Sequence, residues 1–101
     1  MGKRLPRQLE EKLRIVGEQI RLARLRRNLT QKQIADRAMI SVITLTRVEK
    51  GMPNVAIGIY LRVLYALQLA DDILCIAQND PIGRDLQDMN LKHRERASKK
   101  V

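Results

Sequence analysis

The sequence predicts an all-α protein, and three observations lead to that fold class. Between Leu9 and Leu25, apolar residues recur mostly every three or four positions, which is the period of an amphipathic helix. Helix start and stop signals divide the rest of the chain into short helical segments. The 101 residues are 45% hydrophobic but include only two tyrosines and no Phe or Trp. We therefore expect one small helical domain with a core of Leu, Ile and Val.

The first helix is expected from about Arg7 to Arg27. Pro6 lies near its start, and Asn28 can end it. Its apolar positions are Leu9, Leu13, Val16, Ile20 and Leu25. Its last turns carry a basic run of Arg21, Arg24, Arg26 and Arg27. These arginines either stabilise the C-terminal end of the helix dipole or contact phosphates.

The next two helices are short and lie very close together in the sequence. Thr30 can cap the first, with Gln33 reaching back to the Thr30 amide as in a capping box. Ser41 can cap the second, and Gly51 suits the left-handed residue that follows a helix. Only Met39 and Ile40 remain between them. Two helices joined this tightly cross steeply, as in a helix-turn-helix.

The helix after Ser41 has two distinct faces. A helical wheel places Ser41, Leu45 and Val48 on a packing stripe. The roughly opposite face holds Ile43, Thr46, Arg47 and Lys50. Such a face suits a DNA major groove, where guanidinium pairs with guanine and apolar groups contact thymine methyls. An ordinary solvated face is the alternative, although an exposed Ile43 beside Val42 favours contact with DNA or with a protein.

Three further segments follow Gly51. The segment Ala56–Leu69 is apolar on more than one stripe, which predicts a helix covered partly by a second subunit. Asp71 and Asp72 can start a short helix through Ala77, and we prefer this to a metal site. Asp80 caps and Pro81 opens a last helix to about Asn90.

The residues after Leu91 are expected to form a mobile basic tail, because they offer little apolar surface. The tail either contacts phosphates or folds on a partner protein. The predicted organisation is a DNA-binding domain over residues 1–77, followed by the C-terminal helix and tail over residues 78–101.

Net charge favours nucleic acid as a partner. The chain has 20 Lys and Arg against 11 Asp and Glu, a formal charge of +9 and a pI near 10.5. The excess is mainly N-terminal, since residues 1–29 hold nine basic and three acidic side chains. No segment approaches the ~20 apolar residues of a membrane span, and nothing resembles a signal peptide. The scarcity of aromatics disfavours RNA-binding modules that stack bases.

The sequence offers no catalytic, metal or cofactor site. Cys75, the only cysteine, is expected to be a small buried hydrophobe, which fits a reducing cytoplasm. His93 stands alone in the basic tail, and no serine or cysteine has an evident base. We therefore expect no enzyme and no cofactor.

One pattern of residues extends through the two short helices and the segments on either side of them. It comprises Ile20, Arg24, Leu29-Thr30-Gln31, Ile34-Ala35, Ile40-Ser41, Leu45, Arg47-Val48-Glu49-Lys50-Gly51, Leu61, Leu64 and Leu67. This pattern resembles the Cro/cI-type (XRE) helix-turn-helix family. The resemblance implies a five-helix bundle, here with an additional short C-terminal helix and a basic tail. It further implies DNA base-reading roles for Val42, Ile43, Thr46 and Arg47. It implies phosphate contacts by Gln31, and we add Ser41, Thr44, Lys50 and Asn54 as phosphate-binding candidates. It implies an internal ion pair between Arg24 and Glu49.

The sequence departs from the family at Met39, where a small residue is usual, and at Val42 and Ile43, which replace polar residues.

A narrower resemblance lies in residues 55–67, Asp72-Ile73-Leu74 and residues 80–86. These are similar to HipB-like regulators, the DNA-binding antitoxin partners of HipA-like kinase toxins. This resemblance implies a homodimer that represses its own operon and contacts a HipA-like kinase.

The leading expectation is a sequence-specific dimeric repressor that binds an inverted-repeat operator in double-stranded DNA, in the bacterial cytoplasm and associated with the nucleoid. The first alternative is a stand-alone phage-type or metabolic repressor without a toxin. The second is a protein-interaction module without specific DNA binding.

Overall fold

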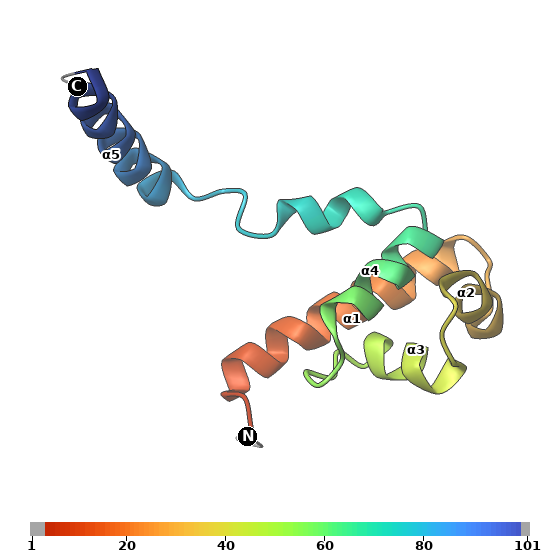
Figure 1. Ribbon diagram of the computed structural model, residues 1–101. Coiled ribbons are helices and arrows are strands. Elements are labelled where there is room, and N and C mark those ends of the chain that lie inside the picture. The colour runs from red at the N-terminus through yellow and green to blue at the C-terminus, as the bar shows by residue number, and fades with distance from the viewer. Residues whose placement is uncertain (1–3, 100–101) are drawn as a thin grey trace.

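The computed structural model describes residues 4–99, with side chains up to residue 91, and this part of the chain is helical without strands. Its elements are α1 (Arg7–Arg26), α2 (Gln31–Ala38), α3 (Val42–Glu49), α4 (Ile57–Ala66), the 3-10 helix η1 (Ala70–Cys75) and α5 (Pro81–Lys99). In the body of the molecule α3 packs on α1 and α2, α2 packs on α4, and η1 follows α4 (Figure 1). The expected all-α class is confirmed.

The core is small and aliphatic. Its largest fully buried side chains are Ile34, Leu45, Val48, Val63 and Leu67. Ile34 belongs to α2, Leu45 and Val48 belong to α3, and Val63 and Leu67 belong to α4 and its C-cap. Three short helices are therefore held by one shared set of contacts. None of them is long enough to be stable in water alone, so their stability comes from this packing.

Local signals form the start of α2 and the turn between α2 and α3 as expected. Thr30 Oγ1 accepts from the Gln33 amide at 3.1 Å, and Gln33 Oε1 accepts from the Thr30 amide at 2.8 Å, which completes the capping box. Ser41 Oγ accepts from the Thr44 amide at 3.0 Å and caps α3. Met39 ends α2 in the left-handed region with φ of 60°. Glycine is favoured there, and a residue with a Cβ costs about 1–2 kcal/mol in that conformation.

Two glycines allow α1 and the end of α3 to cross at backbone distance. A Cβ placed on Gly17, in the middle of α1, would lie 2.6 Å from the Glu49 carbonyl oxygen and 2.7 Å from that of Val48. Gly51 has φ of +70° and faces the Leu13 carbonyl, so a Cβ there would collide with the backbone of α1. Sequence reasoning found Gly51 as a helix stop but missed Gly17. A glycine inside an otherwise regular helix was the available signal, because it weakens the helix unless packing requires it.

The last helix is longer than expected. The last helix, expected to end near Asn90, continues to Lys99, so the backbone of residues 92–99 is helical where a mobile tail was expected. Lys, Arg, Glu and Ala dominate that stretch and favour helix without tertiary contacts. The side chains of this basic tail, including His93, lie outside the described residues. The Asp80 and Pro81 start signal is confirmed, since Asp80 Oδ1 accepts from the Gly83 amide at 3.2 Å.

The prediction for Cys75 was wrong. Its side chain is exposed at the end of η1, and the short helix expected over residues 71–77 is a 3-10 helix from Ala70 to Cys75. Apolar neighbours in the sequence suggested burial, but Leu74 and Ile76 are also exposed, at 68% and 62%. Nothing in the described chain packs over this face of η1.

We expect Gly17→Ala to destabilise the fold by ~1–3 kcal/mol, toward the upper end, because the neighbours of the new methyl group are backbone atoms that cannot move aside. Gly58→Ala is the matched control, since a Cβ at Gly58 in α4 meets nothing within 4 Å. Alanine there should stabilise by about 0.5–1 kcal/mol through helix propensity. Urea unfolding of both variants measures the difference, and equal effects would contradict the close approach of α1 to α3.

Candidate nucleic-acid interface

Helix α3 is held on one side and open on the other. Leu45 and Val48 are completely buried, and Glu49 is 8% exposed. Ile43 is 67% exposed and Val42 40% exposed, on the side away from the core. Ser41, which the helical wheel placed on the packing stripe, is exposed as the N-cap residue instead. Its hydroxyl is used by the turn and does not pack.

The outward face combines apolar, hydroxyl and cationic groups. Arg47 and Lys50 are exposed at the C-terminal half of α3, with no ion-pair partner among the described side chains. Thr46 Oγ1 donates to the Val42 carbonyl at 3.0 Å, so its proton is used within the helix and its oxygen can act as an acceptor. A guanidinium, a short hydroxyl and two branched apolar groups on one exposed helix can read base edges and thymine methyls in a major groove.

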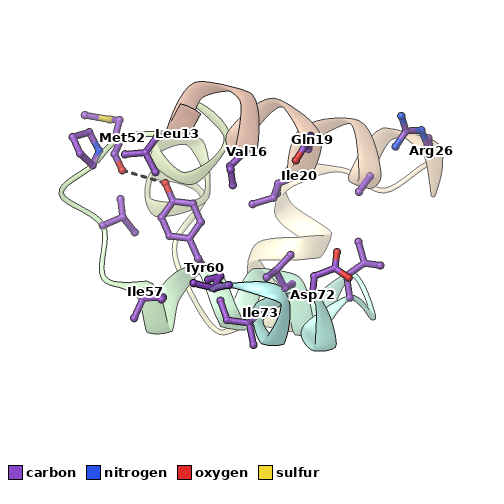
Figure 2. A pocket seen from close by; sticks show the side chains of 16 residues that line it. Leu13, Val16, Gln19, Ile20, Arg26, Met52, Ile57, Tyr60, Asp72 and Ile73 are labelled. Carbon is purple, nitrogen blue, oxygen red and sulfur yellow. Dashed lines mark hydrogen bonds between the residues drawn. The ribbon is translucent and has the colours of Figure 1, made fainter. Parts of the chain in front are cut away.

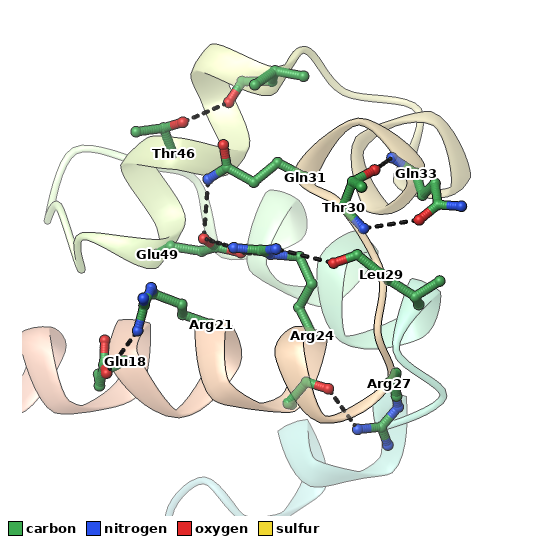
Figure 3. A network of polar contacts seen from close by, with 12 residues as sticks. Glu18, Arg21, Arg24, Arg27, Leu29, Thr30, Gln31, Gln33, Thr46 and Glu49 are labelled. Atoms are coloured by element: carbon green, nitrogen blue, oxygen red, sulfur yellow. Dashed lines mark hydrogen bonds and ion pairs between the residues drawn. The ribbon is translucent and has the colours of Figure 1, made fainter.

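A buried ion pair joins this helix to α1. Arg24 Nε donates to Glu49 Oε2 at 2.7 Å, and Arg24 Nη2 donates to Glu49 Oε1 at 3.1 Å (Figure 3). The two side chains are only 10% and 5% exposed. The third arginine contact, from Nη1 to the Leu29 carbonyl at 3.0 Å, fixes the segment between α1 and α2. This bidentate geometry explains why both charges are tolerated away from water.

Gln31 extends the same network toward the surface. Its Nε2 donates to Glu49 Oε1 at 3.0 Å, so the carboxylate accepts from Arg24 and Gln31 together (Figure 3). An amide nitrogen has two hydrogens, which leaves one donor for an external acceptor such as a phosphate oxygen. The first residue of α2 is thus oriented by the last residue of α3.

The other phosphate-binding candidates surround α3. Ser41 and Thr44 lie at its N-terminal end and hydrogen-bond each other, with 2.9 Å between their hydroxyl oxygens. Lys50 is its C-cap, and Asn54 is exposed in the loop that follows. The structure therefore places these four residues near α3 but gives no contact that assigns them a ligand.

The basic run at the end of α1 is mostly engaged within the chain. Arg21 pairs with Glu18 at 3.1 Å, Arg24 binds Glu49, and Arg27 donates to the Ala23 carbonyl at 2.9 Å. Arg27 thereby satisfies a free carbonyl near the helix C-terminus. These contacts favour the structural role of the run over phosphate binding.

The chain matches one known family over its central part. Residues 20–69 match a family model described as Helix-turn-helix. The match includes α2, α3, the ion pair and every candidate interface residue. No curated protein and no solved structure matched in the corresponding comparisons. Residues 20–69 are therefore similar to a helix-turn-helix domain.

A domain of this class suggests a DNA-binding transcription regulator, and the family is one of regulators rather than enzymes. The HipB-like resemblance has no support from these comparisons and stays a prediction. From Arg4 to Lys99, no helix combines the length and the apolar character needed to cross a membrane. Among the described side chains, no three His, Cys, Asp or Glu residues gather as a metal site.

We expect Glu49→Ala to lower the free energy of unfolding by ~3–5 kcal/mol, because Arg24 would be left buried without its counter-charge. Glu18→Ala, which removes an exposed partner of Arg21, should cost less than about 1 kcal/mol. Urea denaturation measures both. The double variant Arg24→Met/Glu49→Leu should be more stable than Glu49→Ala alone, because it removes both charges. A Glu49→Ala cost as small as that of Glu18→Ala would contradict the structural role of the pair.

Proposed function

We propose that this protein is a sequence-specific, dimeric transcriptional repressor that places α3 in the major groove of double-stranded operator DNA. The observation that carries the proposal is the outward face of α3, on which Ile43 and Arg47 are exposed while the opposite face is locked in the core. A fixed helix with an exposed reading face is what groove recognition requires.

In this proposal Val42, Ile43, Thr46 and Arg47 contact base edges. Arg47 is the principal reader, since its guanidinium can bind guanine O6 and N7 together. Val42 and Ile43 contact thymine methyl groups. Gln31, Ser41, Thr44, Lys50 and Asn54 bind phosphates and set the register of α3 on the duplex. The charge of +9 supplies the non-specific attraction.

We propose a dimer because a single short reading helix contacts only one half-site. Two copies related by a two-fold axis would read half-sites about 34 Å apart on an inverted repeat. Bound across a promoter, the dimer would occlude it. We further propose that residues 1–77 form the DNA-binding part and residues 78–101 a separate C-terminal part, in a protein that acts at the bacterial nucleoid.

The resemblance to HipB-like regulators supports a more specific proposal. The protein would be the autoregulating antitoxin of an operon that also encodes a HipA-like kinase. A stand-alone phage-type or metabolic repressor would have the same domain without that neighbour. Inspection of the adjacent genes distinguishes the two, because only the antitoxin requires a kinase gene beside its own.

Binding to DNA from immediately upstream of the gene tests the repressor proposal. We expect this DNA to bind ~10³–10⁷-fold more tightly than a scrambled duplex at physiological salt. Fluorescence anisotropy with both duplexes measures the ratio. Weak binding with no preference for any genomic fragment would instead favour a protein-interaction module that uses Val42 and Ile43.

Arg47→Ala tests the reading helix itself. Loss of a guanine contact should cost ~1–3 kcal/mol on the preferred operator, or about 5- to 150-fold in affinity, with little change on random DNA. Arg37→Ala is the matched control, because Arg37 is exposed on α2 and lies beside Tyr65 and Asp71 rather than on α3. Equal losses on operator and random DNA after Arg47→Ala would assign Arg47 to phosphate contact only.

A further inference from the structure

An apolar groove separates α1 from α4 and η1, on a different part of the molecule from the reading face of α3. Its volume is 640 Å³, and Figure 2 shows the side chains that line it. Leu13, Val16 and Ile20 of α1 form one wall, and Tyr60, Leu64 and Ile73 lie opposite. Val16 is 40% exposed, so the groove leaves apolar surface in contact with water.

The groove is shaped by side chains that are themselves fixed. Tyr60 Oη donates to the Met52 carbonyl at 3.1 Å, which holds the ring at one end (Figure 2). Burial raises the pKa of this phenol, so it stays protonated and able to donate. Leu13, Val16 and Ile20 follow each other at three- and four-residue spacing along one face of α1. This is the surface that one helix offers to another helix.

An apolar stripe without a partner lies on α5. Ile82, Leu86 and Met89 recur at intervals of four and three residues and share one face of that helix. They are 75%, 57% and 68% exposed, respectively. Helix α5 projects from the body and packs on none of the other described helices (Figure 1). One face of α5 therefore meets water where an amphipathic helix normally meets protein.

The stripe and the groove correspond in length and in charge. Eight residues from Ile82 to Met89 extend about 10 Å, and the groove wall from Leu13 to Ile20 extends about 10 Å as well, at 1.5 Å per residue. Asp85 and Asp88 lie beside the stripe, whereas Arg26 lines one end of the groove. Asp72 of η1 also lines the groove, so the acidic flank of α5 fits the α1 side, where Arg26 lies.

Helix α5 extends away from α1 and α4 of its own chain (Figure 1). Arg84 donates through Nη2 to the Gln78 carbonyl, and Asp80 caps the first turn of α5. These contacts join the start of the helix to the preceding segment. Only a few residues separate η1 from Pro81, and two of them, Gln78 and Asp80, accept these hydrogen bonds. A second copy of the chain can present α5 to the groove without undoing these contacts.

We propose that the two subunits exchange their C-terminal helices, so that Ile82, Leu86 and Met89 of one copy pack in the groove between α1 and α4 of the other. The contact occurs twice around a two-fold axis, because each copy has one groove and one α5. This assignment rests on the proposed dimeric state and adds the surface that forms it. It leaves α3 of both copies exposed for DNA.

Leu86→Asp tests the exchange, and Gln87→Asp is its matched control on a different face of α5. Sedimentation equilibrium of the DNA-free protein should give twice the chain mass for the unmodified protein and for Gln87→Asp. For Leu86→Asp we expect dimer dissociation to become at least ~100-fold more favourable, since a charge replaces an apolar side chain in both contacts. Leu86 belongs to no packed core of its own chain, so the monomeric variant should keep the helix content of the unmodified protein by circular dichroism.

A mixing experiment separates exchange from other dimers. Val16→Asp blocks the groove and keeps α5, whereas Leu86→Asp blocks α5 and keeps the groove. Each variant alone should be monomeric, and an equimolar mixture should regain a heterodimer through its one intact contact. Failure of the mixture to associate would overturn the exchange.

Two other results would also overturn it. A dimer that Leu86→Asp leaves intact would show a different interface and leave the repressor proposal standing. An unmodified protein with the mass of one chain would overturn both the exchange and the dimer. Operator binding is measured separately, so a dimer of the expected kind without sequence preference would contradict the repressor proposal alone.

Discussion

The buried pair of Arg24 and Glu49 is the interaction on which the rest of the structure depends. A charge without a partner inside a protein is expensive, so Arg24 and Glu49 fix each other's position within narrow limits. One belongs to α1 and the other to the last turn of α3, and the same guanidinium binds the Leu29 carbonyl ahead of α2. Three helices are thereby oriented by six polar atoms. The orientation of α3 follows from that arrangement.

Close backbone contact supplements this pair. The absence of a side chain at Gly17 and the left-handed backbone at Gly51 allow α1 to cross the end of α3 almost directly against its carbonyl groups. The crossing and the ion pair restrain the same end of α3. Rigidity is therefore concentrated where a recognition helix needs a defined direction, because misplacing its side chains would lose base contacts. Helix α5 has no comparable restraint on its position relative to the core.

This uneven distribution of contacts places the two proposed functions, DNA recognition and association between copies, on different parts of the molecule. The surface around Arg47 is built on the most constrained part of the molecule, whereas the stripe at Leu86 belongs to its least constrained part. Recognition of DNA benefits from a helix whose direction is set in advance. In the proposed exchange, association between copies uses a helix that extends away from its own core. In the proposed function, DNA recognition and association between copies therefore use different residues.

The local structure was predictable from the residue order alone. The capping box of Thr30 and Gln33, the Ser41 cap and the Asp80-Pro81 start were predicted because each depends on hydrogen bonds between residues a few positions apart. The face of α3 was predicted for a related reason, since helical periodicity alone separates Leu45 from Arg47. Only the tertiary structure decided the exposure of Cys75, the close approach at Gly17 and the groove beside α1. Burial and close approach depend on which distant segments come together, and the order of residues along one helix does not specify that.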